Sequence, residues 1–367
     1  MKILYVTTIG ATMEFFKNFI EMLIMEGHTV DIATNDSVRK VPDCYGAFGC
    51  RVFTLSCSRS LLRKGNLDSI KQIKKLVEAE KYDIVHCHTP IAAVCARLAC
   101  RKLRKTHGVK VFYTAHGFHF FKGSSKLSWA IYYPVEKLCS RFTDKLITIN
   151  REDHILAKSK FKAKEVFYVP GVGIDLSKFL EIAVDKVEKR REIGVPEGAK
   201  LILSVGELNE NKNHRLVIRA LSQMSDSRVH YVIAGDGALS ETLRALAEKL
   251  GVADHVHLLG YRKDVATLYR IADVFCHPSL REGLPVSLME AMACGLPAAC
   301  SRIRGNSDLI DAEGGALFNP RDVEDCRRAL ETVLGGDLGC MGDINRQNAQ
   351  QYSIRYILAQ MKSIYES

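Results

Sequence analysis

Segments with the pattern of a buried β-strand alternate with segments of helical periodicity along the first third of the chain, and this alternation limits the possible folds more than any other feature. The expected strands are 2–7, 30–34, 84–86 and 111–113, and the expected helices are 13–26, 67–80 and a segment from residue 91. Helical segments repeat apolar residues every three to four positions, whereas strands buried on both faces are continuously apolar. Such alternation builds a parallel sheet covered by helices.

The same alternation returns after the connector Val169-Pro-Gly-Val-Gly173. The expected strands are 201–205, 230–234, 256–258 and 274–276, and the expected helices are 214–222, 240–250 and 286–293. A chain of 367 residues is too long for one core. We therefore predict an α/β protein of two doubly wound, Rossmann-like domains, residues 1–173 and 174–351, with the helical segment 352–367 packing back on the first domain. Because ligands of such sheets bind beyond the carboxyl ends of the strands, the site is expected in a cleft between the domains.

Composition indicates an ordinary globular protein, with 47% hydrophobic and 26% charged residues. No apolar run reaches the roughly 18 residues that span a bilayer, and the first eight residues have the pattern of a buried strand rather than a signal peptide. We therefore expect a cytoplasmic protein. The twelve cysteines form no C-x2-C pair and lie mostly in apolar segments, so a disulfide framework is not expected.

The net charge of +10 is concentrated in one half of the chain. Residues 1–180 hold 29 Lys and Arg against 16 Asp and Glu, and the remainder is slightly acidic. Basic clusters lie at Arg59, Arg63 and Lys64 and at 97–105. One interpretation is solvation of a helix end, and the other is attraction to anionic lipid at the inner face of a membrane. No aromatic-interleaved basic stripe supports a nucleic-acid partner.

Two glutamates separated by seven residues, Glu282 and Glu290, bracket the transition from a Gly/Pro loop to an apolar helix. Backbone amides at such a helix N-terminus favour a bound diphosphate. Because two turns of helix are roughly 11 Å long, the carboxylates are placed to address opposite ends of a nucleotide sugar. The alternative is a pair of solvated glutamates.

Other loops after expected strands carry residues suited to phosphate or sugar binding. A loop from Gly206 to Lys212 precedes a helix, and Lys212 is either a point charge on a diphosphate or a solvated surface lysine. In the first domain His116 and His119 lie in an aromatic loop after a strand, and Gly10 follows the first strand. These histidines, with His86 and His88, lack the carboxylate partners and spacing of a zinc site, so no metal site is expected.

Together these motifs resemble glycosyltransferase family 4, a family of retaining enzymes with the GT-B fold. The remaining motifs that carry the resemblance are Gly235-Asp-Gly237, Leu259-Gly-Tyr-Arg-Lys-Asp264, Ala115-His-Gly117 and the connector Val169-Pro-Gly-Val-Gly-Ile-Asp175. Segments 115–123 and 205–214 are similar to bacterial enzymes of capsule and exopolysaccharide assembly, which transfer a sugar to a polyprenyl-diphosphate-linked saccharide. The resemblance therefore implies a metal-independent hexosyltransferase with a nucleotide-sugar donor, expected to be a UDP-sugar, and no cofactor.

The resemblance also implies roles for individual residues. His116 and Glu282 would be catalytic, and the donor would be bound by Gly10, Gly206, Lys212, Tyr261, Arg262, Gly283, Leu284 and Glu290. Glu207 stands where the family commonly has an arginine, and a carboxylate about 5 Å from a phosphate costs on the order of 3 kcal/mol. A compensating cation is expected, with Arg262, Arg302 and Arg304 as candidates.

Alternative functions are a sugar-nucleotide epimerase of the same architecture and a non-catalytic sugar-binding protein. A dehydrogenase is disfavoured because the glycine fingerprint near Gly235 lacks its third glycine.

Overall fold

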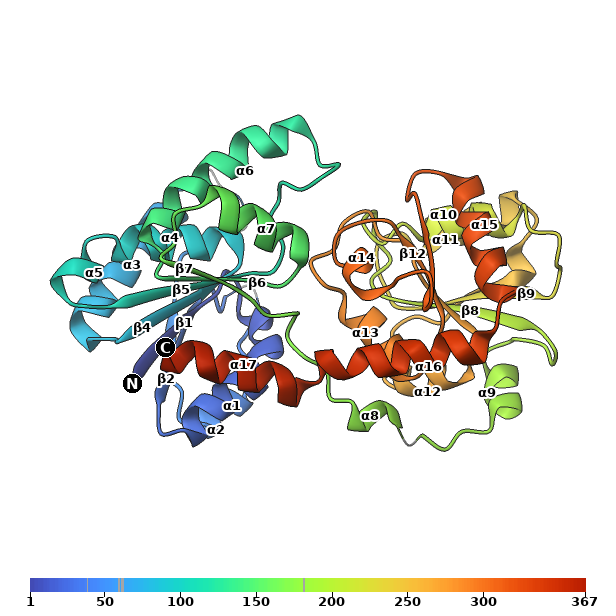
Figure 1. The fold of residues 1–367 in the computed structure, drawn as a ribbon, viewed down its shortest axis with the longest axis horizontal. Helices are drawn as coiled ribbons and strands as arrows, with labels where there is room; N and C mark the ends of the chain where they lie inside the picture. Colours follow the sequence, from blue (N-terminus) through green and yellow to red (C-terminus); the bar gives the residue numbers. More distant parts are fainter. Residues whose placement is uncertain (38, 59, 61–62, 181) are drawn as a thin grey trace. The chain divides into compact units, whose positions relative to one another are not determined.

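The computed structural model describes residues 1–367 except 38, 59, 61–62 and 181, so Arg59 of the first basic cluster lies outside the described residues. The chain divides into two compact units. The first comprises Met1–Val172 and Ile357–Ser367, and the second comprises Gly173–Tyr356. Each contains one parallel sheet with its own helices (Figure 1).

The sheet of the first unit has seven strands in the order β3-β2-β1-β4-β5-β6-β7, all paired in parallel. The strands are β1 (Lys2–Val6), β2 (Thr29–Thr34), β3 (Val52–Thr54), β4 (Ile84–His88), β5 (Lys110–Ala115), β6 (Lys145–Thr148) and β7 (Glu165–Tyr168). The central strands are buried on both faces, which explains their nearly continuous apolar sequence. The strand order reverses between β1 and β4, and ligands of doubly wound sheets bind beside such a switch point.

Helices cover both faces of this sheet. They are α1 (Lys17–Met25), α2 (Cys44–Ala47), α3 (Gly65–Glu80), α4 (Pro90–Cys100), α5 (Leu103–Thr106), α6 (Lys126–Cys139), α7 (Arg151–Lys160) and α17 (Ile354–Glu366). One core cluster joins alternate strand side chains to α3, α4 and α7, with aromatic residues of α6 packed against it. The other cluster joins the opposite side chains to α1, α2 and α17. Helix α17 contributes Ile357, Met361 and Ile364, which lie on one helical face and are buried.

The second unit has a six-stranded parallel sheet in the order β10-β9-β8-β11-β12-β13. Its strands are β8 (Lys200–Val205), β9 (Val229–Ala234), β10 (Val256–Leu258), β11 (Val274–His277), β12 (Ala298–Ser301) and β13 (Gly315–Phe318). Its helices are α8 (Ser177–Leu180), α9 (Lys186–Glu192), α10 (His214–Leu221), α11 (Ser240–Lys249), α12 (Val265–Ile271), α13 (Val286–Ala293), α14 (Asn306–Leu309), α15 (Val323–Leu334) and α16 (Leu338–Asn348). The switch point here lies between β8 and β11.

The fold class predicted from the sequence, two doubly wound α/β domains, is confirmed. One expected element differs. The helix expected over 13–26 is a 3-10 helix at Gly10–Phe16 followed by α1. The 3-10 helix begins at Gly10, where a Cβ would meet the backbone of 39–41.

The sequence suggested that the basic cluster at 97–105 forms a patch on the surface. The structure places only part of this cluster there. Arg97 is buried, with its guanidinium 2.8 Å from Glu136 and over the ring of Tyr113. Arg104 is paired with Asp144. The expectation was wrong for Arg97 because a helix-end cation was assumed to face solvent, whereas this side chain points toward the sheet. Among the described residues, no helix is long and apolar enough to cross a membrane.

Candidate functional site

The switch point of the second unit brings two loops together. One follows β8 and carries Lys212, and the other follows the neighbouring strand β11 and carries Glu282. Backbone and amide hydrogen bonds join the loops: Leu280 N–H donates to the Asn211 carbonyl at 2.8 Å, and the Asn211 amide donates to the Arg281 carbonyl at 3.0 Å. The two loops therefore form one fixed edge.

Lys212 and Glu282 form an ion pair at this edge, with Nζ 2.8 Å from Oε1. The same oxygen lies 3.3 Å from Nε2 of His277, the last residue of β11. Burial raises the pKa of Glu282, but the His277 hydrogen bond and the Lys212 charge outweigh it and hold that pKa well below its usual range. Glu282 is therefore an ionised hydrogen-bond acceptor near neutral pH and has no proton to donate.

His277 and Gly206 support this ion pair in different ways. Burial and the nearby Lys212 lower the pKa of His277, despite the opposing effect of Glu282, so its imidazole is neutral near pH 7. Gly206 has φ of +154°, and a Cβ there would lie 3.1 Å from Cε of Lys212. A side chain at this position would therefore crowd the lysine. The sequence singled out Gly206 and Lys212 but missed His277, whose only signal was a histidine at the end of an apolar strand.

The predicted donor-site residues around helix α13 lie just before its first turn and on its body. Gly283 and Leu284 precede the helix, whose N-cap residue Pro285 provides no side-chain cap. About one turn into the helix, Glu290 accepts a hydrogen bond at 2.9 Å from the Tyr269 hydroxyl of α12. Burial raises the pKa of Glu290, outweighing the opposing effects of Tyr269 and Lys178.

The loop after β10 holds Tyr261 and Arg262. Tyr261 is 76% exposed. Arg262 makes two hydrogen bonds to Asp264, at 2.7 and 2.6 Å, and a third contact to Glu192 at 3.1 Å. The positive charge of Arg262 is therefore already balanced by the carboxylates of Glu192 and Asp264.

The side chain of Glu207 is exposed and accepts a hydrogen bond from the Asn209 amide at 3.0 Å. Among the three cations considered to compensate for it, Arg304 is the one that contacts the Glu282 loop, donating from Nε to the Glu282 carbonyl at 3.1 Å. Arg302 donates instead to the Leu317 carbonyl at 2.7 Å. We therefore favour Arg304 as the cation associated with this edge.

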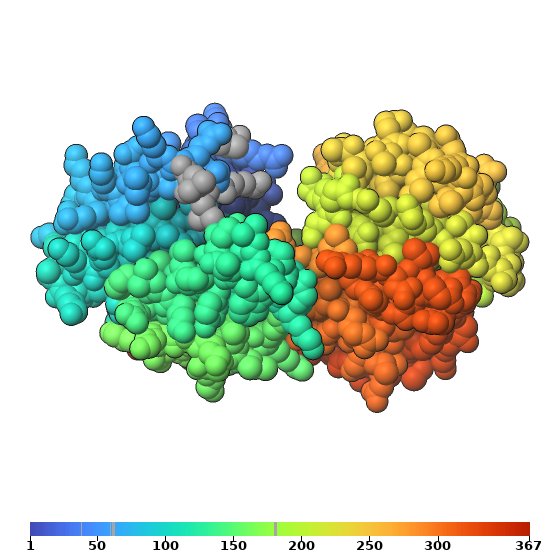
Figure 2. Space-filling view, turned by 90° about the horizontal axis from the view of Figure 1, so that it is seen from above, coloured from blue at the N-terminus to red at the C-terminus, as the bar shows by residue number. Residues whose placement is uncertain are grey.

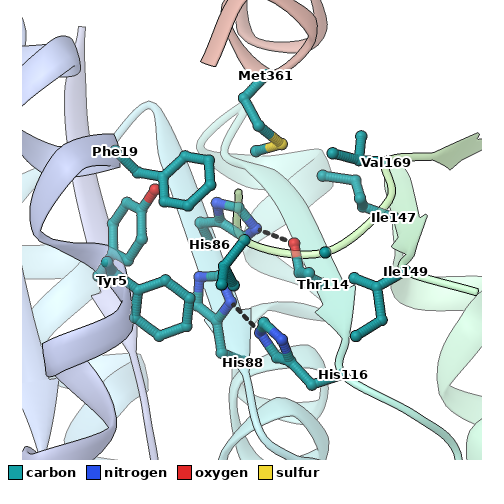
Figure 3. Close-up of a pocket in the computed structure, with 13 residues that line it drawn as sticks. Tyr5, Phe19, His86, His88, Thr114, His116, Ile147, Ile149, Val169 and Met361 are labelled. Carbon is teal, nitrogen blue, oxygen red and sulfur yellow. Dashed lines mark hydrogen bonds between the residues drawn. The ribbon is translucent and has the colours of Figure 1, made fainter. Parts of the chain in front are cut away.

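The carboxyl edge of the first unit has a different chemistry, built from histidines (Figure 3). His88 ends β4 and His116 follows β5, and their Nδ1 and Nε2 atoms lie 3.2 Å apart. Both line a cavity of about 20 Å³ whose other walls are largely apolar. Burial lowers the pKa of His116 to about 4 and that of His88 well below 6.5, with like-charge effects from His86 and His116 adding to the latter. Both rings are therefore neutral.

The contact between these rings constrains their tautomers. His88 Nε2 is buried and has no hydrogen-bond partner among the described residues. A buried lone pair without a partner is better tolerated than a buried N–H without one, which favours a proton on His88 Nδ1 that is donated to His116 Nε2. His116 then carries its own proton on Nδ1, so this ring is arranged as a hydrogen-bond donor.

A second chain of hydrogen bonds ties the C-terminal helix to the same edge. His86 lies 2.8 Å from the Thr114 hydroxyl and 2.5 Å from the Tyr365 hydroxyl, which in turn lies 2.9 Å from Tyr5. Burial lowers the pKa of His86 to about 3. His119, in contrast, packs its ring on Tyr132 of α6.

Gly10 lies at the switch point of the first unit, and its N–H donates to the Asn35 carbonyl at 3.2 Å. Its lack of a Cβ is required by the neighbouring backbone of this chain, and its proposed place beside a diphosphate stays a prediction. Within the described ranges, no three His, Cys, Asp or Glu side chains are grouped in a way that could hold a metal ion.

Comparisons with known proteins agree with this architecture. Residues 2–150 match the family model "Glycosyl transferase 4-like", and residues 185–353 match "Glycosyl transferases group 1". The chain is 36% identical over 360 residues to the putative glycosyltransferase EpsD of Bacillus subtilis, covering 96% of this chain and 92% of that protein. It is 31% identical to the UDP-Gal:alpha-D-GlcNAc-diphosphoundecaprenol alpha-1,3-galactosyltransferase of Escherichia coli, covering 76% and 73%.

Solved structures share the fold at lower sequence identity. The crystal structure of Anabaena HepE in complex with UDP has a TM-score of 0.81, with 18% identity and full coverage of both chains.

Proposed function

Since this chain belongs to family 4 of the glycosyltransferases, which have the GT-B fold, we propose that it transfers a hexosyl group from a UDP-sugar to a saccharide carried on polyprenyl diphosphate, with retention of configuration. The reaction would serve exopolysaccharide or capsular polysaccharide assembly at the inner face of the cytoplasmic membrane. The donor and acceptor classes are those in the name of the Escherichia coli relative. The UDP complex of the structural neighbour supports the same nucleotide.

The observation that carries the proposal is the Lys212–Glu282–His277 group at the switch point. In the transfer, the bond from the anomeric carbon to the diphosphate breaks, and a bond to the acceptor hydroxyl oxygen forms. The hydroxyl proton passes to the departing diphosphate on the same face. Lys212 places an ammonium where negative charge develops, which is usually the largest catalytic term. This charge lets the reaction proceed without a metal or other cofactor.

Glu282, ionised and held by two donors, accepts hydrogen bonds from hydroxyls of the donor sugar. The Gly283 and Leu284 amides, at the uncapped start of α13, face the diphosphate or sugar, and Glu290 accepts from the ribose. Tyr261 is exposed and free to pack on the base. In the first unit, neutral His116 donates a hydrogen bond to a reacting sugar and is too weakly basic to store a proton.

Transfer with purified substrates tests this function. The full chain is incubated with UDP-galactose, UDP-glucose, UDP-N-acetylhexosamines or GDP-mannose and with GlcNAc-diphosphoundecaprenol, in the presence of EDTA, and lipid products are analysed by mass spectrometry. We expect a mass increase of one sugar from one UDP-sugar, with EDTA having no effect. Conversion of the donor without acceptor would favour an epimerase. Failure of every UDP-sugar to stabilise the protein thermally would contradict the donor assignment.

A further inference from the structure

Helix α6 carries apolar side chains on the face opposite the core. Leu127 is 67% exposed, Ile131 41% and Leu138 51%. Their spacings of four and seven residues place them on one side of a helix. Ala130 and Pro134 on the same side are also exposed. We call Leu127, Ile131 and Leu138 the α6 stripe.

The opposite side of α6 fixes the helix to the first unit. Glu136 and Cys139 are buried, and Trp129, Tyr132 and Tyr133 pack against the core. Since these residues already supply the packing that holds the helix, the α6 stripe is not needed for the fold of this unit. Helix α6 lies on the face of the first unit turned toward the viewer in Figure 2.

The exposed charged side chains within 121–141 are all positive, and the nearest acidic group from another element is Glu152, which accepts from the Lys122 N–H at 2.6 Å. Lys122, Lys126, Lys137 and Arg141 are exposed. The only acidic side chain in 121–141, Glu136, is buried in its ion pair with Arg97. An apolar stripe flanked by cations complements an anionic lipid surface, in which the apolar face enters the headgroup region and each cation near the surface adds attraction. A second copy of the same face would instead bring like charges together.

The loop that leads into α6 begins at His116, the candidate catalytic histidine, so the α6 stripe and His116 are close in the chain. The loop 116–125 runs from His116 to Ser125, whose hydroxyl caps the helix by accepting from Ser128 N–H at 3.1 Å. A lipid-carried acceptor has its chain in the bilayer and its sugar outside. A helix lying in the headgroup region would hold the His116 loop close to that sugar.

We propose that α6 is the membrane-docking helix, lying in the plane of an anionic membrane with the α6 stripe inserted below the phosphates. The inference rests on the proposed lipid-linked acceptor and names the surface that reaches it. It replaces the basic cluster at 97–105 as the membrane-contacting element, because Arg97 is buried and Arg104 is paired.

The first test is co-sedimentation of the full chain with vesicles of phosphatidylcholine containing about one third phosphatidylglycerol, without donor or acceptor. We expect the wild type to bind. The variant Leu127→Gln/Ile131→Gln/Leu138→Gln should lose on the order of tenfold or more in partition. Leu67→Gln, which changes a 64% exposed leucine of α3, is the matched control and should bind as the wild type does.

A second pair of variants tests the charges. Lys126→Gln/Lys137→Gln should weaken binding to the anionic vesicles several-fold, and added salt should weaken it further. Lys71→Gln/Lys75→Gln, which changes two exposed lysines of α3, should weaken it less.

Trp129, the only tryptophan of the chain, packs against the core on the opposite side of α6, so insertion is followed with a second tryptophan placed in the stripe by Leu138→Trp. The emission that this variant adds to that of the wild type should shift to the blue with anionic vesicles and be quenched by brominated lipid. The proposal is overturned if the wild type does not bind, if the stripe variant binds like the wild type, or if the stripe variant only dissociates a dimer in solution. UDP binding by the same variants, followed by thermal shift, tests the proposed function separately.

Discussion

The two switch points of this molecule use opposite electrostatics. In the second unit Lys212 and the neutral His277 both contact one carboxylate oxygen of Glu282, and this carboxylate stays ionised. In the first unit paired histidines line a small apolar cavity, and burial keeps them neutral. A diphosphate leaving group needs fixed charge, whereas a sugar hydroxyl needs directional hydrogen bonds. The second unit therefore offers the fixed charge and the ionised acceptor proposed to bind the donor, and the first unit offers neutral hydrogen-bonding groups.

Removing the charge from the second unit should have the largest effect. We expect Lys212→Ala to lower kcat by roughly 10²- to 10³-fold, since it removes stabilisation of the developing diphosphate charge. It also leaves Glu282 with His277 alone. Steady-state transfer measures the loss, and Lys249→Ala, an exposed lysine of α11, is the control. Full activity in Lys212→Ala would contradict the role of the ion pair.

Neutralising the carboxylate should cost somewhat less. Glu282→Gln keeps the shape but replaces a charged acceptor, and loss of a charge-assisted hydrogen bond is worth about 1.5–3 kcal/mol, or roughly 10- to 100-fold in kcat/KM. Glu313→Gln, on an exposed glutamate of the same unit, should have no effect. Acidic pH should not mimic the variant above about pH 5, because the pKa of Glu282 is held well below its usual range. Loss of activity with an apparent pKa near 6 would contradict that state.

The neutral histidines of the first unit should make its stability depend on pH. An unfolded histidine binds a proton below about pH 6.5, whereas burial keeps folded His86 neutral down to about 3. The unfolded state therefore binds more protons as the pH falls through this window, and the free energy of unfolding decreases. Between pH 7.5 and 5 the loss from His86 should be about 2 kcal/mol.

Denaturant unfolding followed by Trp129 fluorescence, which reports the first unit, measures this loss at both pH values. In His86→Gln the decrease from pH 7.5 to 5 should be smaller by that amount, whatever the stability of the variant at pH 7.5. His107→Gln, at an exposed position of the same unit, should keep the full decrease. An equal decrease in His86→Gln and the wild type would show that this ring does not carry the pH dependence.

The sequence predicted the fold class and the central strands because those strands are continuously apolar, but helices α6, α7, α15 and α16 were not expected. Strands β3, β6, β7, β12 and β13 were not expected. They have three or four residues each, and β6 and β7 begin with Lys145 and Glu165, so they are difficult to distinguish from loops in the sequence. Parallel pairing with neighbouring strands of the sheet defines them. The sequence placed Arg97 on the surface because its partner Glu136 lies 39 positions away, beyond any local pattern.

The sequence likewise predicted which loops carry the candidate site, but not the contacts between their side chains. Lys212 and Glu282 belong to recognisable loops, but their direct ion pair depends on the adjacency of β8 and β11. The same holds for His277, which meets Glu282 after a turn, and for His88, which meets His116 across neighbouring strands. Histidines at strand ends are ambiguous in a sequence, because only the neighbouring strand shows whether they bind a metal, a ligand or each other.

The smallest expected effect comes from His88, and it separates activity from stability. Replacing His88 by Phe removes the bond to His116 and also removes a buried nitrogen that has no partner among the described residues. Leaving a buried polar group unpaired costs free energy, whereas an apolar ring of similar shape does not. Stability should therefore be unchanged or higher, while kcat falls about tenfold because His116 loses the partner that fixes its tautomer. Nitrogen-15 NMR of His116 should show the proton redistributed between Nδ1 and Nε2. A variant that loses stability but keeps kcat would show that His88 only packs the first unit, and the neutral edge would then have no part in orienting the sugar.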